Sequence, residues 1–98
     1  MNTTEHLITI LGEEGAEIAQ DCSKCNRFGL QDINFLTPGG PTNVQRLVDE
    51  LNDLEGVKEL LVQNGILPAD WRSEKKIELK KRKVLDMMQY ARDHGSLE

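Results

Sequence analysis

The sequence predicts an all-α fold, a helical bundle of three main helices in a single domain of residues 1–98. Three segments repeat apolar residues at the helical period, clear capping residues stand at the predicted helix starts, and 30% of residues are charged while only 4% are aromatic. A chain this short buries only about 60–65% of its unfolded surface. We therefore expect a homodimer or homotetramer whose interface completes a four-helix-type core.

The first helix is expected from about Thr4 to Asn26, with Thr3 or Thr4 as the N-cap and Glu5 in the first turn. At about 100° per residue, one apolar stripe runs along this segment. It consists of Leu7, Leu11, Ile18, Cys22 and Cys25. The connection that follows is rich in proline and glycine, and a helical turn is expected only near Gln31 to Asn34.

The second helix begins with a capping box, because Thr42 is followed three residues later by Gln45. It is expected to end near Asn64, with Gly65 as the left-handed cap. Its apolar stripe consists of Leu47, Leu51, Leu54, Val57 and Leu61.

The third helix is expected from Ser73, its N-cap, to about His94, and Gly95 ends it. Its apolar stripe consists of Ile77, Val84, Met88 and Ala91. Lys81 has a helical angle inside this stripe, whereas the other lysines there read as a solvated face. Lys81 either reaches a phosphate or the acidic residues, or packs its stem while its amine extends to solvent.

Two carboxylate pairs interrupt the first two apolar stripes. Glu14 with Glu17, and Glu50 with Asp53, are each three residues apart and so share one face of their helix. Glu14 lies roughly 20° from Leu7 on the helical wheel. Acids directed inward in this way need a counter-charge, and Mg²⁺ or Mn²⁺ prefers carboxylate oxygens. The alternative is that all four acids sit at the stripe margins and pair with lysines.

Cys22 and Cys25 form a C-x-x-C pattern on the apolar side of the first helix. We interpret them as small buried core residues of a reducing compartment. A zinc site would need two further ligands, for which His6 and His94 are poorly placed.

The pattern Glu13-Glu14-x-x-Glu17, followed by Glu50-x-x-Asp53, resembles that of the MazG-type all-α nucleotide pyrophosphohydrolases. The resemblance covers roughly residues 5–62, and the short chain and its Arg27-Phe28-Gly29 loop look most like small single-domain members from phages and bacteria. The long connection here departs from the family pattern, and it could help to shape a nucleobase pocket.

The resemblance implies Mg²⁺-dependent hydrolysis of a nucleoside triphosphate to a monophosphate and pyrophosphate. Ligands of the metal would be Glu14, Glu17, Glu50 and Asp53. Glu13 or Glu17 would orient or deprotonate the attacking water, and the sequence does not choose between them. Substrate phosphate contacts are expected from Lys24, Arg27 and Lys81. Four aromatic residues could stack on a base, or else belong to the core or to an interface: Trp71, Phe28, Phe35 and Tyr90.

Three alternatives remain open from the sequence. A related hydrolase would act on dUTP, phosphoribosyl-ATP or an alarmone instead. A small helical interaction or regulatory protein would keep only a structural or vestigial metal site. A di-iron carboxylate bundle would use Glu-x-x-His pairs, and no histidine follows either acidic motif.

Composition limits the classes of partner and the cellular compartment that we expect for this chain. The net charge of −5 argues against binding polymeric nucleic acid, which normally requires a basic domain. No apolar run approaches the roughly 20 residues of a membrane span, and the polar N-terminus does not read as a secretory signal. We expect a cytoplasmic protein without a membrane association.

Overall fold

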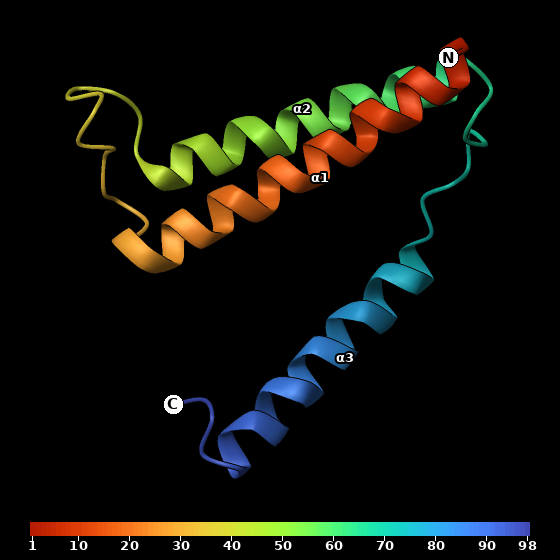
Figure 1. Ribbon diagram of the computed structural model, residues 1–98. Helices are drawn as coiled ribbons and strands as arrows, with labels where there is room; N and C mark the ends of the chain where they lie inside the picture. Colours follow the sequence, from red (N-terminus) through yellow and green to blue (C-terminus); the bar gives the residue numbers. More distant parts are fainter. The chain divides into compact units, whose positions relative to one another are not determined.

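The computed structural model describes residues 1–98 and contains three helices and no strands longer than an isolated bridge. The chain is thus all-α, as the sequence predicted (Figure 1). It divides into two compact units, Met1–Pro68, which contains α1 and α2, and Ala69–Glu98, which contains α3. None of the helices combines the length and the apolarity needed to cross a lipid bilayer.

Helix α1 spans Thr3–Phe28 and begins one residue earlier than the sequence predicted. Its N-cap is Asn2, not Thr3 or Thr4, because the Asn2 Oδ1 atom accepts a hydrogen bond from the Glu5 backbone N–H at 2.8 Å. An asparagine caps a helix as well as a serine and better than a threonine. The helix ends at Gly29, whose φ of 102° is open to glycine at low cost.

Helix α2 spans Asn43–Gln63, and its predicted capping box is confirmed. The Thr42 hydroxyl accepts from the Gln45 backbone N–H at 3.2 Å, and the Gln45 side chain accepts from the Thr42 N–H at 2.7 Å. After the C-cap Asn64, Gly65 has a φ of 71°, so the predicted left-handed termination is also confirmed.

The connection between α1 and α2 is fastened to the start of α2. Asn43 is 5% exposed, and its side-chain amide donates to the carbonyl of Gly29 at 2.9 Å. The Asn43 backbone N–H donates to the carbonyl of Asp32 at 2.9 Å, and Ile33 forms an isolated antiparallel bridge with Thr42. These contacts fix where the loop leaves one helix and enters the next.

The tip of this connection is folded by local hydrogen bonds rather than by the helical turn expected near Gln31 to Asn34. The Asn34 side chain accepts from the Leu36 backbone N–H at 2.9 Å, and the Asn34 carbonyl accepts from the Thr37 N–H at 2.9 Å. Asparagine favours such turns because its short side chain binds its own backbone two residues on.

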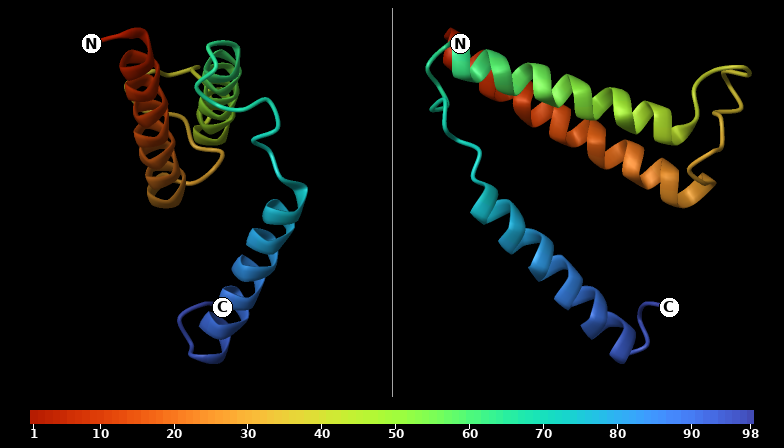
Figure 2. Two further views of the ribbon diagram at one scale, coloured as in Figure 1. Left: turned by 90° about the vertical axis from the view of Figure 1, so that its right-hand side faces the viewer. Right: turned by 180° about the vertical axis from the view of Figure 1, so that it is seen from behind.

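Helices α1 and α2 lie side by side and run antiparallel, as the views agree (Figure 2). The only buried hydrophobic side chains of the chain are Val57 at 8% exposure and Leu61 at 0%, both on α2. Leu7, Leu11 and Ile18 of α1 are half-buried. The predicted stripes therefore face each other, but two helices cover only one side of each stripe.

Because α2 covers only one side of α1, the two cysteines of α1 differ in their exposure. Cys25 is half-buried and Cys22 is exposed, and both thiols are free. The expectation that both are buried core residues is therefore wrong for Cys22, since α2 alone does not reach around to that side of α1.

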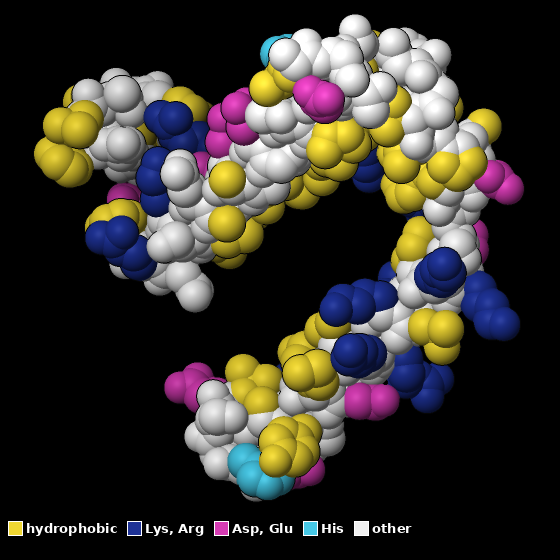
Figure 3. Space-filling model, turned by 45° about the vertical axis from the view of Figure 1, so that its right-hand side comes forward, with side chains coloured by type: hydrophobic (Ala, Val, Ile, Leu, Met, Phe, Trp, Pro, Cys, Tyr) yellow, Lys and Arg dark blue, Asp and Glu magenta, His cyan; other side chains and the backbone are white.

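The second unit consists of helix α3, Glu74–Asp93, and its flanking segments. Ser73 caps the helix by accepting from the Lys76 backbone N–H at 3.2 Å, and Gly95 follows the C-cap His94 with a φ of 77°, both as predicted. No residue of α3 is buried. Apolar side chains are exposed along α3 and along the hairpin of α1 and α2, and Lys and Arg side chains crowd α3 (Figure 3).

Candidate functional site

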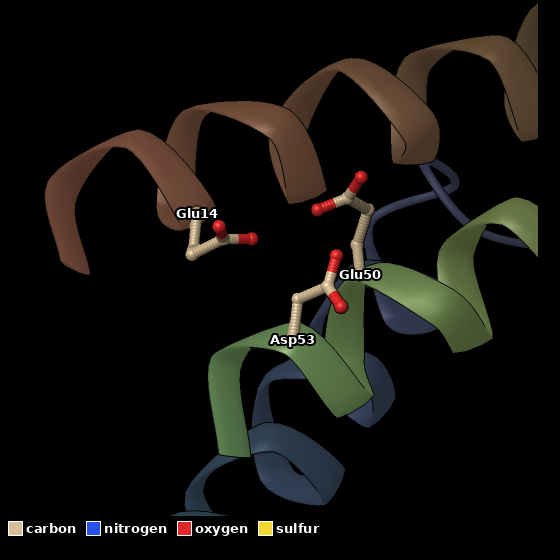
Figure 4. A group of neighbouring side chains, drawn as sticks. All are labelled: Glu14, Glu50 and Asp53. Carbon is tan, nitrogen blue, oxygen red and sulfur yellow. The ribbon is translucent and has the colours of Figure 1, made fainter. Parts of the chain in front are cut away.

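A cluster of carboxylates lies where the middles of α1 and α2 face each other. Glu14 of α1 and Glu50 and Asp53 of α2 each bring one carboxylate oxygen within 4.8 Å of the other two. Their side chains extend from the two helices toward a common point (Figure 4). The three-residue spacing on α2 places Glu50 and Asp53 on one face, and the antiparallel pairing sets Glu14 opposite them.

Glu17 extends the cluster by one turn of α1. Its carboxyl group is a hydrogen-bond partner of the Glu50 carboxyl group, and this bond is the main cause that raises the pKa of Glu17. The charge of Glu50, some burial, and the charges of Asp53 and Glu13 raise the pKa of Glu17 further. All four acids predicted as metal ligands are thus brought together, and Glu13 lies close enough to act on Glu17.

Glu50 interacts with each of the other three acids, Glu14, Glu17 and Asp53. Its hydrogen bond with Glu17 lowers the pKa of Glu50, but burial, a hydrogen bond with Glu14, and the charges of Glu14 and Asp53 outweigh it, so the pKa is raised. Both Glu14 and Glu50 also carry a buried Oε2 atom that has no hydrogen-bond partner. Buried acceptors without donors are costly, and a cation at this point would relieve that cost for both oxygens.

The cluster is chemically suited to a hard divalent cation. Its donor atoms are all carboxylate oxygens, which suit Mg²⁺, Mn²⁺ or Ca²⁺ rather than softer metals. Ion pairs of the chain lie elsewhere and join Lys58 to Glu55, Arg72 to Glu74, and Lys81 to Glu78. None of these three ion pairs involves Glu14, Glu17, Glu50 or Asp53, so they do not support the alternative in which lysines pair with the four acids.

The predicted phosphate-binding residues lie in three different places. Lys24 is half-buried on α1 and lines a pocket at the loop end of the hairpin. Arg27 is exposed and holds its guanidinium 4.9 Å from the centre of the Phe28 ring. Lys81 belongs to the second unit and donates to Glu78 at 2.9 Å within α3. Its role at a phosphate stays a prediction.

The loop pocket has a volume of about 260 Å³ and combines aromatic, aliphatic and polar walls. Phe28 and Phe35 are 55% and 85% exposed, so the pocket offers aromatic faces to a ligand. Its lining residues are Lys24, Phe28, Asp32, Ile33, Asn34, Phe35, Leu36 and Asn43. Lys24 and Asn43 lie seven residues from Glu17 and Glu50, about 10 Å along the helices.

Two residues near the cluster were missed by the reasoning from sequence. Asp21, buried at 9% exposure, follows Glu17 by four residues on α1, and Arg46, half-buried, precedes Glu50 by four residues on α2. The four-residue spacing on the same helix face was the signal that could have found both. Each extends the polar face from the carboxylate cluster toward the loop.

Comparisons with protein-family models, with curated proteins and with solved structures gave no match to this chain. The geometry of the cluster and the acidic pattern therefore carry the functional argument by themselves.

Without divalent cations, we expect the melting temperature to fall as the pH rises above the ordinary pKa of 4.5 and through the raised pKa values of Glu17 and Glu50. Folding raises the pKa of Glu17 and of Glu50, so the folded state binds protons more tightly than the unfolded state. The resulting stabilisation is complete below the ordinary value of 4.5. It is lost as the pH rises through the raised folded values.

Thermal melts followed by circular dichroism in a chelator measure this trend. Glu17→Gln should flatten it, because the amide cannot ionise, whereas Glu59→Gln, which changes an exposed acid of α2, should leave it in place. A pH dependence that is the same in wild type and Glu17→Gln would contradict the crowding of these carboxylates.

Proposed function

We propose that this chain is a Mg²⁺-dependent nucleotide pyrophosphohydrolase that cleaves a nucleoside triphosphate into a nucleoside monophosphate and pyrophosphate. The observation that carries the proposal is the meeting of Glu14, Glu50 and Asp53 within 4.8 Å, with Glu17 against Glu50. These are the four positions that the EExxE and ExxD resemblance implies as ligands. The bond cleaved and the substrate class rest on that resemblance.

In this proposal the four carboxylates hold Mg²⁺, with Mn²⁺ as an alternative. The cation would offset phosphate charge and activate a water for attack on the phosphoryl group. Glu17 lies against Glu50 and is exposed, so its carboxylate could receive a proton from that water. Glu13, which is also exposed, is the other candidate for this step.

The loop pocket supplies a place for the base. It lies on the hairpin that carries the carboxylates, about 10 Å from them along the helices. A base stacked on Phe28 or Phe35 would set its phosphates between the pocket and the cluster. Asp32 and Asn34 line the same pocket and offer polar groups to the edge of a base.

The exposed apolar surface supports a homodimer or homotetramer. Only Val57 and Leu61 are buried hydrophobic residues, while Val48, Leu51 and Leu60 of α2 are 45–49% exposed. A second hairpin packed on these residues would complete a four-helix core. The same surface also favours the second candidate, a small helical interaction protein that keeps a structural metal site.

We expect Glu50→Gln to abolish hydrolysis while the helix content stays unchanged. The amide keeps the shape of the side chain but removes the charge that would hold the metal, and it should raise the stability of the metal-free protein by relieving repulsion. Ribo- and deoxynucleoside triphosphates, dUTP, phosphoribosyl-ATP and an alarmone are incubated with Mg²⁺, and the products are separated by chromatography.

Glu59→Gln is the matched control on the same helix and should retain full turnover. Full turnover by a correctly folded Glu50→Gln protein would refute the role of Glu50. No hydrolysis of any substrate by the wild type would favour the interaction protein. Release of pyrophosphate from only one member of the panel would identify the substrate.

A dimer or tetramer is expected in solution, because apolar side chains of α2 are exposed on the hairpin of α1 and α2, and no residue of α3 is buried within its own unit. Light scattering coupled to size exclusion at micromolar concentration measures the mass. A value equal to the monomer mass of 11.1 kDa would contradict the proposed assembly.

A further inference from the structure

We propose that Arg46 forms an anion-binding site that receives a phosphoryl group beside the carboxylate cluster. This inference deepens the proposed function and rests on it, since it names the residue that holds the polyphosphate between the cluster and the loop pocket. The chemical class of the ligand is a metal-chelated di- or triphosphate.

The Arg46 guanidinium has few hydrogen-bond partners within the chain. Its Nε atom is buried and has no hydrogen-bond partner. The Arg46 Nη2 atom lies 3.4 Å from the Thr37 hydroxyl oxygen, a distance longer than that of a usual hydrogen bond. A guanidinium carries five N–H donors, and the contact with Thr37 accounts for only one of them.

Along α2, Arg46 lies between the carboxylate cluster and the loop pocket. It precedes Glu50 by four residues on α2, which places it on nearly the same face and about 6 Å along the helix axis from the cluster. Asn43, which lines the loop pocket, lies three residues further in the same direction. Arg46 thus stands on α2 between the carboxylates and the pocket.

The contacts of Arg46 differ from those of the other lysines and arginines of its unit. Lys58 pairs with Glu55, and Arg27 stacks on Phe28. Lys24 lines the loop pocket. Arg46 takes part in none of the three ion pairs described above, although residues 1–68 contain eleven acids and only four lysines or arginines.

The local charge selects the class of ligand. A free anion approaching Arg46 would be repelled by four nearby carboxylates, whereas an anion that arrives with a divalent cation would not be. A phosphoryl group fits the two parallel donors of a guanidinium, and its neighbouring phosphates could chelate the cation at the cluster. A metal-bound polyphosphate satisfies both requirements together.

The test uses inorganic tripolyphosphate with Mg²⁺ as the probe, because it offers the phosphoryl chain without base or sugar. Isothermal titration calorimetry measures its affinity for wild type, Arg46→Gln and Arg46→Lys. Arg46→Gln should weaken binding about tenfold or more. Arg46→Lys should retain part of the affinity, since it keeps the charge but loses the paired donors.

Two control variants separate ligand binding from a structural role. Arg72→Gln makes the same change at an arginine whose Nε is already bound by Glu74 at 2.8 Å, and it should bind the probe like wild type. Thr37→Val removes the hydroxyl that Arg46 contacts. Equal weakening by Thr37→Val and Arg46→Gln would show that Arg46 acts by fastening the loop and would overturn the proposal.

The outcomes also distinguish this inference from the proposed function. If wild type and Arg46→Gln bind the probe equally while wild type hydrolyses nucleotides, Arg46 is not the anion site and the proposed function stands. If tripolyphosphate binding depends on Arg46 but no nucleotide is hydrolysed, the anion site stands and the proposed function fails. Circular dichroism of each variant confirms that the helices remain folded.

Discussion

The repulsion among four carboxylates at the contact between α1 and α2 is the constraint around which this hairpin is built. The two helices bury only Val57 and Leu61 as hydrophobic core, while Glu14 and Glu50 each place an unpartnered carboxylate oxygen out of solvent. The hydrogen bond with Glu50 and the charge of Glu50 raise the pKa of Glu17. Against the lowering effect of the bond with Glu17, burial and the neighbouring Glu14 and Asp53 raise the pKa of Glu50. This crowding weakens the metal-free fold.

The hairpin arranges its polar residues in a definite order along its length. The carboxylate cluster occupies the middle of the two helices, Arg46 lies one turn toward the loop, and the loop pocket follows. The capping box at Thr42 and the buried side chain of Asn43 hold the loop on the start of α2 and so fix this order. Under the proposed function, a metal-bound nucleoside triphosphate would meet the carboxylate cluster, Arg46 and the aromatic wall of the loop pocket in that order.

Local rules predicted the helices and the acid pairing well. Thr42, Ser73 and Gly65 act as the caps that their types favour. The three-residue spacing indicated that the acids of each pair share a helix face, and their place in the apolar stripes indicated that they point inward, where Glu14, Glu50 and Asp53 meet. These features depend on one helix or on one pairing of two helices. They are therefore visible in the order of the residues.

Features that depend on more distant contacts escaped prediction. The exposure of Cys22 follows from how little of α1 a single neighbouring helix covers, and the unpartnered Nε of Arg46 follows from where the loop places Thr37. The Asn2 cap was missed because Thr3 and Thr4 are also favourable caps. The pair of Lys81 with Glu78, by contrast, is a local contact three residues apart on α3, which helical spacing could have indicated.

The central claim, that the carboxylate cluster is a divalent cation site, is tested most directly by thermal melts in Mg²⁺ and in NaCl of matched ionic strength. Mg²⁺ should bind the folded cluster and hardly at all the dispersed acids of the unfolded chain, giving about 1–3 kcal/mol at about 5–100 times its Kd. Each kcal/mol moves the Tm of a domain this small by about 4–8 °C. NaCl should do much less, because screening acts on all surface charges alike. Asp53→Asn should abolish most of the shift that is specific to Mg²⁺, and melts that coincide in the two salts would contradict the claim.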